Sequence, residues 1–313
     1  MIGYILRRIV LMLLVMLIVS STVFAIIRLA PGDPATVMLG DLATQADVER
    51  LRNSLGLDKP LIQQFGIFLG RIATGDLGTS IVFNRPVLSI IGDRAELTLV
   101  LTFLSISLAI AIGVPIGILS ATKHGTLADQ ALTTGSMFAA SLPSFWIGLT
   151  LMTFFSVDLR WFPVAGYGPP DATFAERLHY LVLPAIALGV PSSALIMRFT
   201  RNGMLEVLSE DYIRTARAKG MPMSLVIWKH ALKNALNQIL TVVGLTVAIL
   251  LGGAVVTESV FALPGVGRLV VQSVLNRDYP VIQGTLLVVS GVYVVINLII
   301  DILYAVIDPR VRY

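Results

Sequence analysis

The sequence predicts an all-α polytopic membrane protein, and three observations support this fold class. Six segments carry no charged residue, and each is 18 to 28 residues long. A helix needs about 20 apolar residues to cross a bilayer, so each segment can span it. The segments also lack the strict alternation of apolar and polar residues that a membrane-spanning barrel requires. They are Ile9–Ile27, Leu97–Thr122, Gln130–Val157, Tyr180–Met197, Asn234–Thr257 and Tyr279–Ile300.

The composition argues against a soluble protein. Only 13% of the 313 residues are charged and 56% are hydrophobic, whereas soluble domains contain about 25% charged residues. A large soluble helical protein is therefore the weaker alternative. The absence of cysteine excludes disulfides, a thiol nucleophile and a thiolate metal site.

The charge distribution predicts that both termini are cytoplasmic. With the N-terminus inside, the inner loops hold 12 Lys and Arg residues and five acidic residues, Arg201 and Asp129 among them. The outer loops then carry a net charge of −2, as the positive-inside rule expects. The net charge of +4 thus needs no nucleic-acid partner. The first segment exceeds the ~7–15 apolar residues of a signal peptide, so residues 1–28 are interpreted as an uncleaved signal anchor.

Residues 29–96 predict a small folded extracytoplasmic element. Thr44–Gly56 has an N-cap residue and a glycine stop, which indicates a helix. A second amphipathic stretch opens at Lys59-Pro60 and continues to about Arg71, and Gly75–Gly78 has the composition of a turn. Apolar residues in both stretches can cover a core, which favours folded structure over a disordered linker.

The inner loop 198–233 contains a short predicted helix. Ser209 is a candidate N-cap, and Glu210 can pair with Arg214 one turn later. Gly220 can adopt the left-handed conformation after the helix, and Pro222 prevents its continuation. Because about ten residues form only a marginal helix in water, it must dock on something. Periodicity alone leaves a protein partner and the anionic lipid surface equally open.

Several blocks of sequence resemble one transporter family, in the same order along the whole chain. They are Ala30–Pro34, Leu55–Leu61, Gly75–Gly78, Asp211–Gly220, His230–Ala235, Glu258–Arg268, Arg277–Gln283, Asp301–Ala305 and Asp308–Tyr313. Asp211–Gly220 resembles the coupling loop of ATP-binding-cassette (ABC) importer permeases, and the set is most similar to the dipeptide, oligopeptide and nickel permease family. One departure is Arg214, where the general pattern has glutamate. His230 and Lys233 also replace isoleucine and proline. Which charged residue makes the main ATPase contact therefore stays open.

The resemblance implies a type I ABC importer permease fold with six transmembrane helices and a core permease domain over residues 97–313. It also implies that the short helix inserts into a cleft of a separate ATPase subunit. The implied coupling residues are Glu210, Asp211, Tyr212, Arg214, Thr215, Ala216, Arg217, Ala218, Lys219 and Gly220. None of the five lysines follows a glycine as a phosphate-binding G-K-[ST] loop requires, so ATP and Mg²⁺ are expected on partner subunits.

The implied partners are a second homologous permease, two ATPase subunits or domains, an extracytoplasmic substrate-binding protein and membrane lipid. The implied location is the bacterial inner membrane. Prolines 115, 143, 184 and 191 are expected to break or kink their spans, which can open a cavity. Candidate residues of the translocation pathway are Ser141, Pro143, Ser144, Phe145, Asn237, Thr241 and Gly244, although contacts between helices explain the polar residues equally well. Candidate contacts with the binding protein are Phe261, Pro264, Gly265 and Arg268, although a plain connecting turn explains these residues equally well.

Four alternatives remain beside a peptide importer. The same machinery can import glutathione or a nickel chelate. A proton-coupled transporter is less favoured because, among ionisable groups, only Asp301 is expected near the bilayer. A channel would need a filter or an acidic pore cluster, and none is evident. An intramembrane enzyme would need a nucleophile with a base, but the three histidines lie in separate loops. No catalytic or metal-binding residue is predicted.

Overall fold

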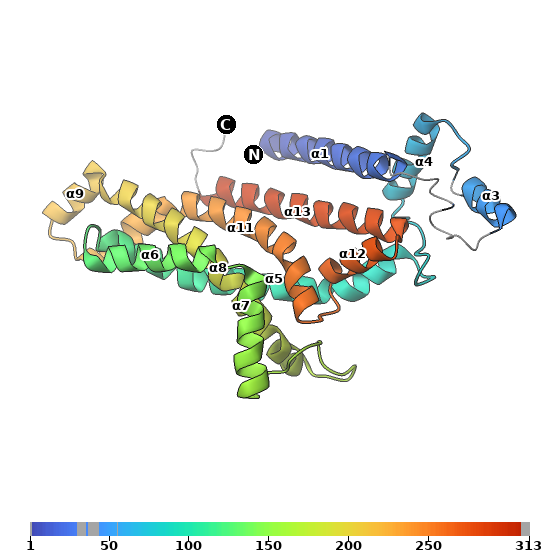
Figure 1. The fold of residues 1–313 in the computed structure, drawn as a ribbon. Coiled ribbons are helices and arrows are strands. Elements are labelled where there is room, and N and C mark those ends of the chain that lie inside the picture. Colours follow the sequence, from blue (N-terminus) through green and yellow to red (C-terminus); the bar gives the residue numbers. More distant parts are fainter. Residues whose placement is uncertain (1, 30–35, 37–43, 55, 308–313) are drawn as a thin grey trace. The chain divides into compact units, whose positions relative to one another are not determined.

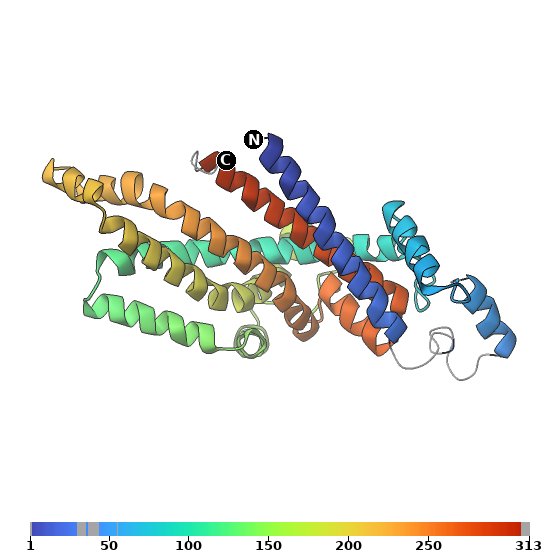
Figure 2. The same cartoon turned by 90° about the horizontal axis from the view of Figure 1, so that it is seen from above.

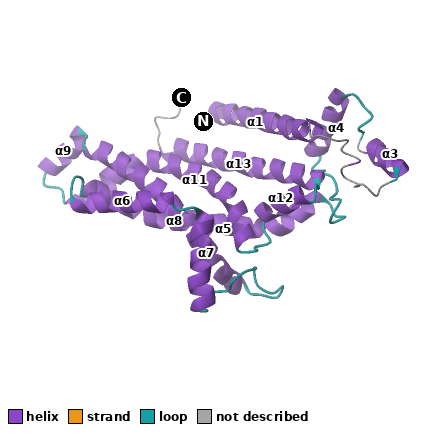
Figure 3. Ribbon diagram, in the orientation of Figure 1, coloured by secondary structure: helices purple, strands orange, loops and turns teal. Residues whose placement is uncertain are grey.

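The described part of the chain folds into helices joined by loops. The structure is a computed structural model that describes residues 2–29, 36, 44–54 and 56–307. Figure 3 shows helices and loops in this part of the chain and no strand. The predicted fold class is therefore confirmed.

In chain order, the first group of helices precedes residue 173 and the second group follows it, and Figure 1 labels most of them. The first group is α1 (Ile2–Leu29), α3 (Gln45–Ser54), α4 (Leu61–Ala73), α5 (Val87–Thr122), α6 (Leu127–Ser141), α7 (Ser144–Leu151) and the π-helix η1 (Met152–Asp158). The second group is α8 (Phe174–Leu208), α9 (Asp211–Ala218), α10 (Met223–Leu225), the π-helix η2 (Val226–Ala231), α11 (Leu232–Val260), α12 (Val266–Leu275) and α13 (Tyr279–Ile307).

Five of the predicted spans are continuous in the structure and the third is not. Within the described residues, five apolar stretches are long enough to cross a membrane. The third predicted span is instead the pair Leu127–Ser141 and Ser144–Asp158, which bends by 91° (Figure 1). The bend lies at Leu142 and Pro143, whose backbones are extended. Proline disfavours a helical residue before it, which explains the break.

The other prolines do not break their helices. Pro115 lies inside α5, and Pro184 and Pro191 lie inside α8, without interrupting either helix. A break is therefore excluded at these three positions, and a kink there stays a prediction. Neighbouring helices can compensate the lost backbone hydrogen bond in a membrane protein, so proline alone does not fix a break.

The structure divides into two compact units. Unit 1 consists of Met1–Glu96 and Leu269–Ile299, and unit 2 consists of Leu97–Arg268 and Ile300–Tyr313. These units are defined by contacts between residues and not by the side of the membrane on which the residues lie. The predicted domain division into residues 1–28, 29–96 and 97–313 therefore stays a prediction. The second span also belongs to a longer helix than predicted, because α5 begins at Val87.

Unit 1 confirms the local predictions for its loop. Thr44 Oγ1 accepts a hydrogen bond from the Asp47 amide at 3.3 Å at the start of α3, and Gly56 follows that helix with φ +66°. α4 begins directly after Pro60. The Phe24 ring of α1 contacts the rings of Phe65 and Phe68 of α4, with centroids 5.3 and 5.5 Å apart. These aromatic contacts fix α4 on the end of α1.

Unit 2 is built around α8. Figure 2 shows α6, α8 and α11 running beside one another, and both α6 and α11 contact α8. α5 approaches α8 through glycines. A Cβ at Gly113 would lie 2.6 Å from the Ser193 carbonyl oxygen, and one at Gly117 would lie 2.7 Å from the Met197 carbonyl oxygen. Small residues allow such close backbone contact between membrane helices.

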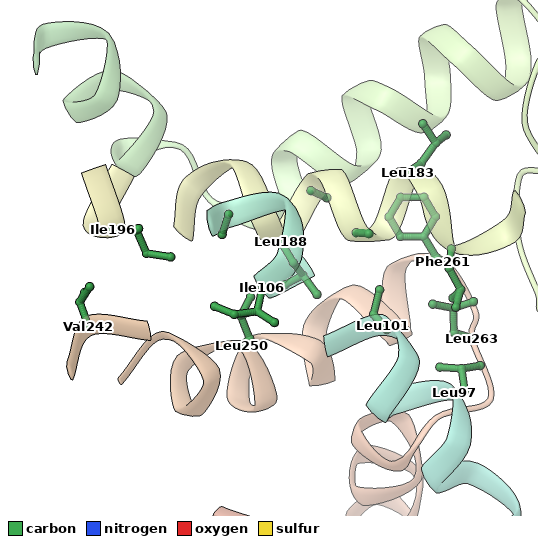
Figure 4. Packing of buried hydrophobic residues seen from close by; sticks show 14 residues of the cluster. Leu97, Leu101, Ile106, Leu183, Leu188, Ile196, Val242, Leu250, Phe261 and Leu263 are labelled. Atoms are coloured by element: carbon green, nitrogen blue, oxygen red, sulfur yellow. The ribbon is translucent and has the colours of Figure 1, made fainter. Parts of the chain in front are cut away.

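The main apolar core of unit 2 joins α5, α8, α11 and the loop after α11. Leu101 of α5, Leu188 of α8 and Leu250 of α11 are each at most 4% exposed. Phe261 and Leu263 from the loop enter the same cluster (Figure 4). The loop after α11 is therefore anchored in the core.

Candidate functional site

The short helix predicted in the inner loop is present as α9, but it begins later than expected. Ser209 has helical backbone angles and its hydroxyl donates to the Glu206 carbonyl oxygen at 2.7 Å, so it ends α8. Glu210 has the extended backbone of an N-cap, without a capping bond from its side chain. The prediction of Ser209 as the N-cap is therefore wrong. Only Ser209 and Glu210 separate α8 from α9, and Ser209 completes α8.

The charge pair on α9 also differs from the prediction. The Arg214 guanidinium pairs with Asp211 rather than with Glu210. Both side chains of the observed pair are highly exposed, at 73% and 89%. Exposed pairs contribute at most about 1 kcal/mol, so this pair does little to hold the helix.

The C-terminal end of α9 confirms the prediction. Gly220 has φ +75°, the left-handed conformation that only glycine adopts without strain. The Gly220 amide donates to the Arg217 carbonyl oxygen at 2.9 Å, and the Met221 amide donates to the Ala216 carbonyl oxygen at 3.3 Å. These two bonds form a Schellman motif. The chain direction after α9 is therefore fixed.

An apolar seat in unit 2 holds α9. We define the seat as the cluster of Ile118 and Ala121 of α5, Met204 of α8, Val226 and Ala231 of η2, and Ala235 and Ile239 of α11. Ile213 and Ala216 of α9 lie one turn apart and enter it, with 0% and 8% of their surfaces exposed. Burial of one face of an amphipathic helix compensates for its short length.

Polar contacts reinforce the same arrangement. The Asn234 side-chain amide of α11 donates to the Tyr212 hydroxyl oxygen at 2.8 Å. The Gln238 amide, one turn further along α11, donates to the Glu206 carboxylate of α8 at 2.6 Å. α9, α8 and α11 are therefore linked by both apolar and polar contacts.

The ten predicted coupling residues fall into two groups. The first group is Ala216 alone, whose side chain is buried in the seat. Ile213 is buried there too, but it was not among the predicted residues. The remaining nine are exposed: Glu210, Asp211, Tyr212, Arg214, Thr215, Arg217, Ala218, Lys219 and Gly220. Their contact with an ATPase stays a prediction, and the structure adds that Ala216 holds the helix in place.

A buried ion pair lies beside the seat, and the sequence analysis missed it. Arg201 of α8 donates from Nε and Nη2 to the two Asp129 oxygens of α6, at 2.8 and 2.9 Å. Ser120 of α5 also donates to Asp129, at 2.5 Å. The Asp129 side chain is 5% exposed and that of Arg201 is 19% exposed. These residues were counted as ordinary loop charges, and no sequence signal paired two residues that lie 72 positions apart.

The last turn of α11 contains a second buried acid. Glu258 is 0% exposed; it accepts a hydrogen bond from the Thr98 hydroxyl of α5 at 2.6 Å and one from the Arg268 amide at 2.9 Å. A Cβ at Gly265 would overlap the Glu258 carboxylate. Glu258 directly follows the fifth predicted span and is buried among protein atoms, and the expectation that only Asp301 lies near the bilayer stays a prediction. Glu258 joins α5 to the first turn of α12, a structural use of the carboxylate.

The predicted contacts with a binding protein differ in exposure. Phe261 is 2% exposed and Gly265 is buried, whereas Pro264 is exposed. The Arg268 guanidinium is partly buried and donates to the Ala262 carbonyl oxygen at 2.7 Å. The role of all four stays a prediction. A partner protein that approaches this loop would contact the exposed Pro264 rather than the buried Phe261 and Gly265.

The predicted pathway residues occupy two places in unit 2. Ser141, Pro143, Ser144 and Phe145 lie at the bend between α6 and α7, and Asn237, Thr241 and Gly244 lie on α11. A Cβ at Gly244 would lie 2.5 Å from Ile300 Cδ1, so this glycine permits close packing with α13. The assignment of these residues to a pathway stays a prediction. Over the described ranges, no three acidic or histidine side chains gather closely enough to hold a metal ion.

Comparison with known proteins decides the family. Residues 113–313 match the family described as the inner membrane component of binding-protein-dependent transport systems, and residues 1–102 match the N-terminal family of the same components. The chain belongs to this family. It is therefore a multi-pass bacterial inner-membrane permease subunit of an ABC importer, a transport component that works with ATPase and substrate-binding partners.

Individual relatives cover the whole chain. The probable peptide ABC transporter permease protein y4tP of Sinorhizobium fredii is 46% identical, over 99% of each chain. The glutathione transport system permease protein GsiC of Pectobacterium atrosepticum is 45% identical, over 100% of each chain. A solved structure of the MetNI methionine ABC transporter in inward-facing conformations superposes with a TM-score of 0.59. That match covers 70% of this chain and 96% of the other at 19% identity, which shows a shared fold.

Proposed function

We propose that this permease forms half of the translocation pathway of an ATP-driven peptide importer and that α9 couples it to an ATPase subunit. The observation that carries the coupling proposal is the two-sided character of α9. One side is fixed in the seat by Ile213 and Ala216, and the other presents Thr215, Ala218 and Lys219 to the surroundings. A helix fixed in this way can transmit a displacement to α5, α8 and α11 without unfolding.

The peptide class of the substrate is supported by the relatives. The S. fredii permease is named for peptide transport and the P. atrosepticum permease for glutathione transport. Glutathione is itself a tripeptide, so both names point to small peptides. Glutathione import is the second candidate, because its named permease matches this chain over its full length.

The remaining partners of the proposal are a second homologous permease, two ATPase subunits that bind ATP and Mg²⁺, and an extracytoplasmic binding protein. In this assembly α9 and both termini face the cytoplasm and the 29–96 element faces outward. The excess of basic residues in the inner loops supports this orientation.

The absence of cysteine permits a direct test with single-cysteine variants. Ala218→Cys places a thiol on the exposed side of α9, and Ala46→Cys places one on the exposed surface of α3 as the matched control. In intact cells, a membrane-impermeant maleimide is expected to label only the Ala46 variant. In the purified complex, a short cross-linker is expected to join only the Ala218 variant to the ATPase.

Two results would contradict the coupling proposal. One is labelling of the Ala218 variant from outside the cell, and the other is cross-linking of the ATPase to the Ala46 variant instead. The substrate is tested separately, by uptake of a labelled dipeptide into proteoliposomes that contain the full complex. Strong inhibition by excess glutathione but not by unlabelled dipeptides would favour the second candidate.

A further inference from the structure

A cavity of about 360 Å³ opens within unit 1, where α4, the segment 76–81 and the first turns of α13 meet. This volume lies within the range of about 300–1,000 Å³ that small-molecule sites occupy. Its lining includes Phe68, Arg71 and Ile72 from the α4 side, and Gly284 and Leu287 from α13. Nothing in the transport role described above uses this cavity.

Buried contacts fix the walls of the cavity. Asp278, which is 1% exposed, accepts a hydrogen bond from the Ser80 hydroxyl at 2.5 Å and another from the Val82 amide at 3.3 Å. The segment that lines one wall is therefore tied to the start of α13. Gly284 allows α13 to pack closely against the start of α5 and against Leu77, since a Cβ there would lie 2.5 Å from Val87 Cγ1 and 3.3 Å from Leu77 Cβ. The cavity is thus preformed.

The position of the cavity relates it to the membrane surface. Gly284 and Leu287 lie in the first turns of a membrane span that begins at Tyr279, so this wall is at the edge of the hydrocarbon region. On α4, Leu61 and Ile62 are 62% and 86% exposed. An amphipathic helix with such a face rests in the interface between headgroups and acyl chains.

The rim of the cavity carries one charge of each sign. Arg71 Nε and Asp76 Oδ2 lie 4.0 Å apart, and their side chains are 46% and 58% exposed. The two groups are too far apart for a direct hydrogen bond at these atoms. A guanidinium binds phosphate through paired donors, and a carboxylate accepts hydrogen bonds from a primary ammonium. The rim is therefore complementary to a ligand that carries both groups.

We propose that this cavity binds a phospholipid whose headgroup carries a phosphate and a primary ammonium, as in phosphatidylethanolamine. The phosphate lies at Arg71 and the ammonium at Asp76, while an acyl chain follows Leu287 along α13. A lipid fits better than a soluble zwitterion because most of the cavity lining is apolar and because α4 also exposes the apolar side chains of Leu61 and Ile62.

The test uses the purified transport complex in nanodiscs of phosphatidylcholine that contain a small fraction of a photoactivatable lipid. One sample contains photoactivatable phosphatidylethanolamine, and a parallel sample contains phosphatidylglycerol, which has a phosphate but no amine. Mass spectrometry then maps the cross-links. We expect phosphatidylethanolamine to label the 68–81 and 280–287 segments above the level of other spans, and to do so more strongly than phosphatidylglycerol.

Three variants separate the two charges. Arg71→Ala is expected to lower labelling by both lipids about fivefold, the effect of losing one solvent-accessible charge pair. Asp76→Asn keeps the oxygen that accepts from the Gly78 amide at 2.9 Å, so the turn is preserved. This variant is expected to remove the preference for phosphatidylethanolamine over phosphatidylglycerol and to leave labelling by phosphatidylglycerol unchanged. Arg50→Ala, at an arginine 78% exposed on α3, is the matched control and should change neither result.

The proposal is overturned if labelling is uniform along α13, or if Arg71→Ala and Arg50→Ala have the same effect. It is also overturned if an excess of free dipeptide displaces the lipid from these segments, because the cavity would then be a peptide site. These outcomes are independent of whether α9 contacts an ATPase, since the cavity lies entirely in unit 1.

Discussion

Replacement of Ile213 by alanine should release α9 from its seat. Ile213 is completely buried in an apolar cluster. Truncation of a buried isoleucine to alanine costs about 2–5 kcal/mol, because apolar contacts are lost and a cavity remains. α9 has only eight helical residues, and such a short helix is marginal without tertiary contacts. The cost should therefore appear as local opening of α9 rather than as global unfolding.

The magnitude can be measured by hydrogen–deuterium exchange of the α9 amides in the detergent-solubilised chain. At the lower limit of about 2 kcal/mol, the open population rises about 30-fold, since each 1.4 kcal/mol is a factor of ten. Ile213→Val should have a smaller effect, because Ile→Val typically costs about 0.5–1.5 kcal/mol. In the full transporter, ATP hydrolysis should continue while peptide uptake falls.

Arg217→Ala is the control, because Arg217 lies on the same helix but is exposed. Surface substitutions usually change stability by less than about 0.5 kcal/mol, so exchange of α9 should change at most about twofold. Unchanged exchange in Ile213→Ala, or equal acceleration in both variants, would refute the idea that the seat holds α9.

Three further substitutions test the packing of unit 2. Gly117→Ala places a Cβ against α8, and overpacking of about 1–3 kcal/mol should lower the thermal unfolding midpoint of the solubilised chain. Asp129→Asn leaves the partly buried Arg201 guanidinium without its carboxylate partner. Loss of one member of a buried pair costs about 3 kcal/mol, so the thermal unfolding midpoint should fall further than in Gly117→Ala. Gly265→Ala forces the Glu258 carboxylate out of its place, so limited proteolysis after residue 258 should be faster while the midpoint changes less.

Matched glycines provide the controls for these substitutions. Gly66 of α4 and Gly252 of α11 have no atom within 4 Å of a built Cβ. Alanine in a helix is more favourable than glycine by about 1 kcal/mol, so both control variants should be as stable as the parent or slightly more stable. A similar loss at the control positions would show that the assay reports helix perturbation in general.

The sequence predicted those elements whose cause is local. The positions of the apolar helices followed from the absence of charge, and the end of α9 followed from Gly220 and Pro222. The start of α9 did not, because Ser209 can cap one helix or complete another, and the two-residue spacing to Asp211 decides between these uses. Proline at 143 and at 115 looked equivalent, although only the first breaks its helix.

The buried charges could not be predicted in the same way. Thr98 and Glu258 are 160 residues apart, and a glutamate at the end of an apolar stretch resembles the polar boundary of a span. One signal was present in the sequence: Gly265 and Gly267 follow Glu258 closely, and paired glycines indicate that another group approaches the backbone. The structure shows that the group at Gly265 is the Glu258 carboxylate, and that the nearest group at Gly267 is the Val255 backbone.

The contact between Ser80 and Asp278 has a consequence for biosynthesis. The two residues are separated by 198 positions, so the ribosome must deliver nearly the whole chain before this bond can form. Unit 1 therefore cannot close until the start of α13 has been synthesised, although its larger portion is translated first. During that interval the newly inserted early helices wait in the bilayer without their final partner, and a nascent chain that stops before α13 leaves them as a target for quality-control proteases.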